Sequence, residues 1–212
     1  MLLHAQSLTH CFENTLYKDL ELTLESKQSI AIMGVSGSGK STLLHNLSTM
    51  LKPTSGQVML FGLDIYSLKP HILLTLRREK IGIIFQAHYL FRGFSVKENL
   101  EIASILSGNG IDTELLEKFG IAHTLYQDIG SLSGGQQQRL SIVRILTKRP
   151  KIIFADEPTG NLDSKSAYDV MECLLGFIRD SDSGLLIVTH DINVAKMCDR
   201  AYRLEHGVLE KL

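Results

Sequence analysis

The sequence predicts an α/β fold with a mostly parallel sheet, an antiparallel β-subdomain at the N-terminus and an inserted α-helical subdomain. Short, continuous apolar runs are typical of parallel strands that are buried on both faces. Helical patterns separate such runs here, as expected where helices connect parallel strands. Weak apolar alternation before the first run favours antiparallel strands. The runs are 30–33, 81–85, 152–155 and 185–188.

Composition narrows the class of protein. The chain has 212 residues, enough for one large domain or for one domain with a small inserted subdomain. Its 22 basic and 23 acidic residues give a net charge of −1, which does not point to nucleic acid or to an anionic membrane. No apolar run approaches the roughly 18 residues of a membrane span, and the N-terminus does not resemble a signal peptide. The three cysteines are far apart without a C-x-x-C pattern, which indicates reduced thiols in a cytosolic protein.

The antiparallel β-subdomain is predicted over Leu2 to Leu24. Phe12 lies in this segment, and core packing is the simplest role for it. Further along the chain, a turn, a strand and a helix are predicted before the second apolar run, which ends at Gln86. These three elements are 53–56, 57–61 and 72–78.

The segment 34–42 follows the first apolar run and fits the phosphate-binding pattern G-x-x-x-x-G-K-[ST]. Glycine lets the backbone wrap a phosphate, and the N-terminus of the next helix, predicted to extend to Leu51, adds its positive end. Lys40 is placed to reach the β- and γ-phosphates, and the Ser41 hydroxyl to ligate Mg²⁺. The loop predicts nucleotide binding, which kinases, GTPases and motor ATPases share. It consists of Gly34, Val35, Ser36, Gly37, Ser38, Gly39, Lys40, Ser41 and Thr42.

The inserted helical subdomain is predicted over about 87–131. Ser95 and Glu98 form an S-x-x-E capping box that opens a helix, and the chain stays mostly helical as far as Ile129.

A second anion-binding pattern follows this subdomain. Ser133 and Gln136 have capping-box spacing, so a helix is expected to begin here and to run to Lys148. Two glycines leave the first N–H groups of that helix exposed. The pattern consists of Leu132, Ser133, Gly134, Gly135 and Gln136.

The third apolar run ends in two carboxylates, Asp156 and Glu157. Ligands of parallel sheets bind at the carboxyl ends of the strands. Adjacent residues on a strand point to opposite faces, so the two carboxylates need different roles unless the chain bends there. We expect Asp156 to bind Mg²⁺ and Glu157 to orient or deprotonate a water molecule.

His190 follows the fourth apolar run directly. A lone histidine is usually structural, but this one is predicted at the same sheet edge as Lys40 and Glu157, which favours a functional role. The remaining elements are a turn at 158–163, a helix at 164–179, a helix capped by Asp191 and a hairpin around 206–207.

Taken together, these motifs resemble the ATP-binding-cassette ATPases in order and approximate spacing, over essentially the whole chain. The Leu-Ser-Gly-Gly-Gln signature is specific to that superfamily. Within it, the segments 82–90, 136–139 and 156–163 resemble the lipoprotein-releasing, macrolide-export and cell-division branch. The chain departs from the pattern at 143–146, where Val-Arg-Ile-Leu replaces the usual Ala-Arg-Ala-Leu.

The resemblance implies one nucleotide-binding domain over 1–212 and a head-to-tail homodimer with two ATP molecules between the subunits. Each site would pair the phosphate-binding loop of one chain with the signature loop of the other. Ser133 and Gly135 would then cap the γ-phosphate from the opposite chain, while Asp163 links the two sites.

The same resemblance assigns the chemistry. Gln86 would contact Mg²⁺ or the attacking water, Glu157 would polarise that water, and His190 would contact the γ-phosphate. Phe12 falls where the family usually stacks an aromatic side chain on adenine.

Two functions are expected of such a chain, which lacks a membrane span of its own. The favoured one is the ATP-hydrolysing subunit of a membrane transporter or substrate extractor. The alternative is a cell-division ATPase that signals through a membrane partner without transport. Soluble cassette ATPases of DNA repair or translation fit poorly, because they need a long coiled-coil insertion or two cassettes in one chain.

The segment after Gln86 is the expected contact with a transmembrane permease subunit. It is unusually apolar and aromatic for an exposed connection, and in the family it receives a short cytoplasmic helix of the permease. The protein is therefore expected in the cytoplasm, peripheral on the inner face of the cell membrane. The segment contains Ala87, His88, Tyr89, Leu90, Phe91 and Phe94.

Overall fold

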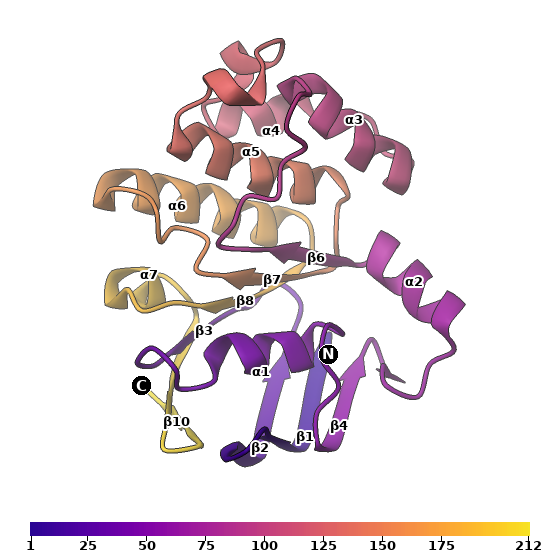
Figure 1. The fold of residues 1–212 in the computed structure, drawn as a ribbon, viewed down its shortest axis with the longest axis vertical. Helices are drawn as coiled ribbons and strands as arrows, with labels where there is room; N and C mark the ends of the chain where they lie inside the picture. The colour runs from indigo at the N-terminus through magenta and orange to yellow at the C-terminus, as the bar shows by residue number, and fades with distance from the viewer.

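Two sheets organise the chain, which the computed structural model describes over residues 1–212 (Figure 1). An antiparallel sheet has the strand order β2-β1-β4-β5, and a six-stranded sheet has the order β10-β9-β3-β8-β7-β6, parallel except at its edge strand β10. The predicted α/β fold, with an antiparallel sheet at the N-terminus and a mostly parallel main sheet, is confirmed. The first sheet contains β1 (Leu3–Cys11), β2 (Thr15–Leu24), β4 (Ser55–Leu60) and β5 (Leu63–Asp64); the second contains β3 (Ser29–Met33), β6 (Ile81–Ile84), β7 (Ile152–Asp156), β8 (Gly184–Val188), β9 (Arg200–Glu205) and β10 (Val208–Lys211).

Helices cover both faces of the parallel sheet. Figure 1 shows α1 between the two sheets, α5, α6 and α7 on the opposite face, and α3 and α4 beyond α5. Short 3₁₀ turns at Ala122–Thr124 and Ile129–Ser131 complete the helical segment between β6 and β7. None of the helices is both long and apolar enough to cross a membrane. The helices are α1 (Lys40–Leu47), α2 (Pro70–Glu79), α3 (Val96–Ser107), α4 (Thr113–Lys118), α5 (Gly134–Thr147), α6 (Ser164–Asp180) and α7 (Ile192–Lys196).

Successive side chains of the central strands enter two different hydrophobic cores. In β3, Ile30 and Ile32 pack with α1 and the antiparallel sheet, whereas Ala31 and Met33 pack with the helices of the other face. The strands β7 and β8 alternate in the same way. Because both faces of these strands are covered, their sequences are continuously apolar rather than alternating.

Several predicted boundaries differ from those in the structure, and two of the differences have a clear local cause. The helix after the phosphate-binding loop does not reach Leu51; it ends at Leu47, since Thr49 adopts a left-handed backbone conformation with φ of 75°. The strand predicted to end at Phe61 ends at Leu60, because Phe61 is also left-handed, with φ of 53°, and begins the turn into β5.

The departure from the family pattern at 143–146 has a counterpart in β6. A Cβ atom on Gly82 would lie 2.6 Å from Ile145 Cγ2 and 3.0 Å from Pro150 Cγ. Ile145 therefore occupies the space that a side chain at position 82 would need.

We expect Gly82→Ala to lower the free energy of unfolding by about 1–3 kcal/mol, the usual effect of overpacking. Ile145→Ala in the same chain should recover part of that loss, and Pro150 limits the recovery. Urea unfolding of both single variants and the double variant measures the coupling. Gly176→Ala in α6 is the control, because a Cβ there meets nothing within 4 Å. If Gly82→Ala lowers the free energy of unfolding equally whether residue 145 is isoleucine or alanine, the steric explanation is contradicted.

Candidate active site

The carboxyl ends of three parallel strands meet at one edge of the main sheet. Val188 of β8 is the pairing partner of both Ile32 in β3 and Asp156 in β7. The phosphate-binding loop after β3, Glu157 after β7 and His190 after β8 therefore emerge side by side. This edge is where parallel sheets bind ligands.

A cavity of about 540 Å³ opens at this edge. All but one of its lining residues were predicted as site residues. The exception, Leu16 of β2, packs against the phosphate-binding loop: a Cβ on Gly39 would lie 3.5 Å from Leu16 Cβ. No sequence pattern identifies Leu16, because its position depends on how the two sheets meet. The predicted residues on the wall are Phe12, Ser36, Gly37, Gly39, Lys40, Ser41, Thr42, Gln86, Asp156, Glu157 and His190.

The phosphate-binding loop is shaped to present hydrogen-bond donors to an anion. Gly37 and Gly39 are left-handed, with φ of 80° and 97°, and α1 begins immediately afterwards at Lys40. The Lys40 ammonium group donates to the carbonyl oxygens of Gly34 and Val35, at 2.8 and 2.9 Å. The Ser38 hydroxyl group is buried without a hydrogen-bond partner. Exposed N–H groups at a helix N-terminus, with a lysine folded over them, suit a phosphate.

The two carboxylates face the same cavity because the chain bends between them. Glu157 leaves β7 with φ of 46°, so the strand alternation that would separate it from Asp156 ends there. Glu157 Oε2 lies 3.0 Å from His190 Nδ1. Ser41 Oγ donates to Asp156 Oδ1 at 3.1 Å, and burial nevertheless raises the pKa of Asp156.

Ser41, Asp156 and Gln86 offer a hydroxyl, a carboxylate and an amide oxygen on one cavity wall. Hard cations such as Mg²⁺ prefer oxygen ligands and keep several waters, so few protein ligands are sufficient. No three His, Cys, Asp or Glu side chains are arranged so that they alone could hold a metal ion. The residues present fit Mg²⁺ at this wall.

The predicted residues of the signature loop, Leu132 to Gln136, do not line this cavity, and neither does Asp163. The predicted capping box is confirmed: Ser133 N–H donates to Gln136 Oε1 at 2.9 Å, and Gln136 N–H donates to Ser133 Oγ at 3.2 Å. Asp163 caps α6 by accepting from the backbone N–H groups of Lys165 and Ser166, and the bonds from Ser166 lower its pKa. Ser133 and Gly134 are exposed.

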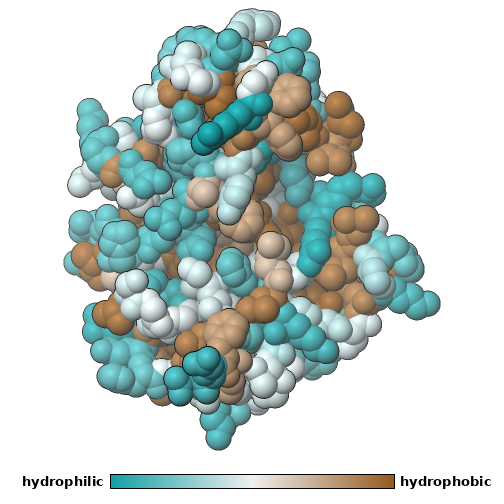
Figure 2. All heavy atoms as spheres, in the orientation of Figure 1, coloured by the Kyte–Doolittle hydropathy of each residue, from teal (hydrophilic) through white to brown (hydrophobic).

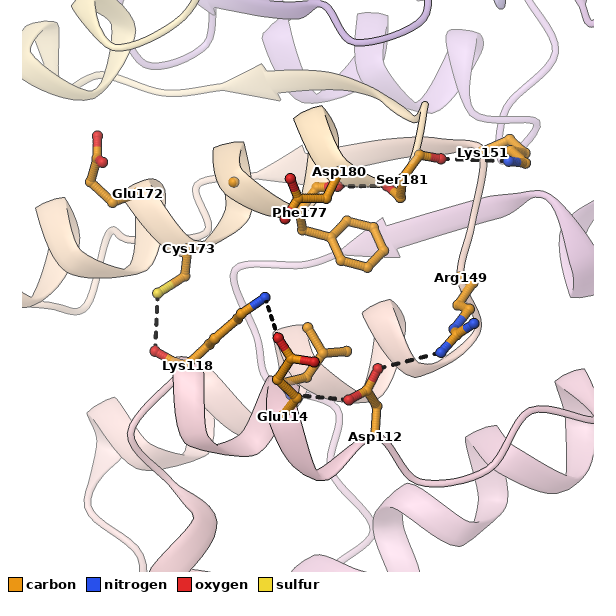
Figure 3. Close-up of a pocket in the computed structure, with 12 residues that line it drawn as sticks. Asp112, Glu114, Lys118, Arg149, Lys151, Glu172, Cys173, Phe177, Asp180 and Ser181 are labelled. Carbon is orange, nitrogen blue, oxygen red and sulfur yellow. Dashed lines mark hydrogen bonds and ion pairs between the residues drawn. The ribbon is translucent and has the colours of Figure 1, made fainter.

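A larger cavity, about 660 Å³, lies elsewhere, between α4 and α6. Figure 3 shows the Phe177 ring pointing into it, and two ion pairs lie on its wall. Lys118 Nζ lies 2.8 Å from Glu114 Oε1, and Arg149 Nη2 lies 3.6 Å from Asp112 Oδ2. None of the predicted site residues lines it, so cavity size alone would have indicated the wrong place.

Comparisons with known proteins agree with this architecture. The family model described as ABC transporter matches residues 17–160. The lipoprotein-releasing system ATP-binding protein LolD of Rickettsia felis is 41% identical over 197 residues, which cover 90% of this chain and 87% of the relative. LolD of Geobacter metallireducens is 41% identical over 196 residues, with the same coverage. The dimeric ATP-binding cassette MJ0796, solved in a post-hydrolysis state with ADP and Pi, superimposes with a TM-score of 0.88 at 33% identity, covering 100% of this chain and 99% of that one.

Asp156→Asn is expected to stabilise the ligand-free protein at neutral pH. Because burial raises the pKa of Asp156 in the folded state, its ionised form destabilises the fold above that pKa. The difference between variant and wild type should shrink as the pH falls and the wild-type carboxylate takes up a proton. Ser41 can still donate to the amide oxygen. Unfolding free energies measured from about pH 8 to about pH 4 test this; a variant that is less stable at every pH contradicts it.

Proposed function

Because the chain belongs to the ABC transporter family as one of its ATP-binding, ATP-hydrolysing subunits, we propose that the complex it powers releases lipoproteins from a membrane. The observation that carries this proposal is the 41% identity to LolD over 90% of the chain. These relatives favour release over the alternative of cell-division signalling without transport. In the proposed complex the chain lies in the cytoplasm, against a permease on the inner face of the cell membrane.

ATP would occupy the cavity at the sheet edge. Phe12 is 64% exposed, which leaves its ring free to stack on adenine, and His10 packs against it edge-on with ring centroids 4.7 Å apart. Lys40 would exchange the carbonyl oxygens of Gly34 and Val35 for the β- and γ-phosphates. The buried Ser38 hydroxyl and the loop N–H groups would gain partners at the same time.

Hydrolysis would then depend on the pair formed by Glu157 and His190. Glu157 accepts a proton from the attacking water or orients it, and its contact with His190 fixes the carboxylate near the γ-phosphate. Gln86 would hold the same water or the metal. Mg²⁺, held by Ser41, Asp156 and Gln86, would supply charge neutralisation.

We further propose that the complete site needs two chains. Ser133 and Gly134 of the signature loop are exposed, Gly135 is partly exposed, and the loop lies outside the cavity of its own chain. Ser133 and Gly135 would therefore be free to cap the ATP of a second copy. Asp163, at the start of α6, would link the two sites. The similar cassette MJ0796 is described as dimeric, which supports a homodimer.

The permease would dock on the segment after Gln86. Tyr89, Phe91 and Phe94 are 66%, 45% and 43% exposed, whereas Leu90 packs against the core. Figure 2 shows further hydrophobic residues over α3, which follows this segment, and Ile105 there is 80% exposed. An exposed apolar surface of this kind is typical of a protein interface.

Glu157→Gln should lower ATP turnover by about 10²–10⁴-fold, because the amide cannot accept the proton. The amide oxygen of the variant can still accept from His190, so the site should keep its shape and still bind ATP. The ATP that is not hydrolysed should then hold the dimer together. ATP turnover and gel filtration with ATP measure the two effects. Turnover close to that of the wild type would exclude Glu157 as the base.

Tyr89→Ala should weaken permease binding and permease-stimulated ATP hydrolysis. It should lower the free energy of unfolding by at most about 1 kcal/mol, for the loss of its edge-on ring contact with Phe85. Leu90→Ala is the matched control: it removes a core contact and should cost about 1–3 kcal/mol of stability.

Both variants are compared with the wild type after reconstitution with the copurified permease in vesicles that carry a labelled lipoprotein. ATP-dependent release of the lipoprotein supports the proposed function, and ATP hydrolysis without release overturns it. Full coupling of Tyr89→Ala would place the docking surface elsewhere.

A further inference from the structure

Three consecutive glutamines attach the first turn of α5 to three different parts of the chain. Gln136 closes the capping box with Ser133. Gln138 is buried, and its Nε2 donates to the carbonyl oxygen of Pro158, the residue after Glu157, at 2.7 Å. Gln137, between them, bridges two loops that belong to different ATP sites in the proposed dimer.

Gln137 holds the signature loop with one end of its amide group. Its Nε2 donates to the carbonyl oxygen of Leu132, the first residue of that loop, at 3.1 Å, and to that of Ile129 at 3.3 Å. Both amide hydrogens are thereby directed at carbonyl groups, which leaves Oε1 to accept. Oε1 lies 3.4 Å from His88 Nδ1, so the hydrogen bond requires His88 to carry its proton on Nδ1.

His88 is two residues from Gln86, which lines the ATP cavity. The segment is anchored again at Phe91: its N–H donates to Asn99 Oδ1 at 2.9 Å, and its carbonyl oxygen accepts from Asn99 Nδ2 at 3.2 Å. Arg144 of α5 lies 5.6 Å from the centre of the Phe91 ring. The path from Gln86 to the signature loop is therefore short: Gln86, His88, Gln137 and Leu132.

We propose that Gln137 is a positioning residue that ties the Gln86 segment of one ATP site to the signature loop that serves the other. The inference rests on the two-chain site proposed above. When Gln86 shifts on loss of the γ-phosphate, His88 moves with it and displaces Gln137. Gln137 in turn moves the backbone carbonyl next to Ser133. Each chain thus reports the state of its own nucleotide to the site that it completes for its partner.

Two heterodimers, each with one intact ATP site, distinguish two effects of a change at His88. One acts through Gln137 on the signature loop of the same chain, and the other acts directly on Gln86 in the ATP site of the same chain. Lys40→Ala chains and Ser133→Arg chains are each expected to be inactive alone, and the heterodimer in their mixture should contain one intact site. In the first mixture His88→Phe, which keeps a ring but removes the donor, is added to the Lys40→Ala chain, whose signature loop serves the intact site. In the second it is added to the Ser133→Arg chain, whose phosphate-binding loop serves it.

We expect turnover to fall about tenfold in the first mixture and to stay within about twofold in the second. His88→Asn keeps a donor at the Nδ1 position. When it takes the place of His88→Phe in the first mixture, turnover should return to that of the parental mixture. A fall confined to the second mixture, or equal in both, overturns the inference, and so does no fall in either. Failure of His88→Asn to restore turnover also overturns it. If the parental mixture without a change at His88 shows no turnover, the two-chain site itself is wrong, and the proposed dimer fails with it.

Discussion

In-register parallel pairing of β3, β8 and β7 is the constraint on which the whole site depends. Parallel strands in register end at the same edge, so the residues that follow them are brought together whatever their distance in the sequence. Parallel pairing also requires crossover connections, which place α1 on one face and α5, α6 and α7 on the other. The two cores that result bury the strands completely, and this rigidity holds Lys40, Glu157 and His190 in a common arrangement.

The site keeps several polar groups in unfavourable surroundings. The Asp156 carboxylate is buried enough to raise its pKa, the Ser38 hydroxyl has no partner, and Lys40 is held by backbone carbonyl oxygens instead of an anion. A nucleotide with a cation would satisfy all three at once. Ligand binding should therefore be coupled to folding stability, since a ligand that binds only the folded state stabilises it.

Local sequence signals predicted those parts of the fold and site that local forces determine. Buried strands, the glycine-rich loop and the capping boxes at Ser95 and Ser133 are visible because each is fixed by residues close in the sequence. The predicted end of α1 is wrong, because the sequence carries no local signal for the left-handed backbone of Thr49. The wall formed by Leu16 and the bridge from His88 to Gln137 escaped prediction for another reason: both join residues that meet only after the sheets and helices have packed. The roles of Ser133 and Asp163 depend on a second chain and stay predictions.

The left-handed backbone at Glu157 has a consequence for how this protein evolves. A glutamate in that conformation stores strain that a glycine would not, because glycine lacks the Cβ that causes it. Selection for folding alone would thus favour losing the carboxylate at the position where the proposed chemistry needs it. With the proposed role, selection for activity opposes that loss, and in a copy of the gene released from this selection the position is expected to change readily.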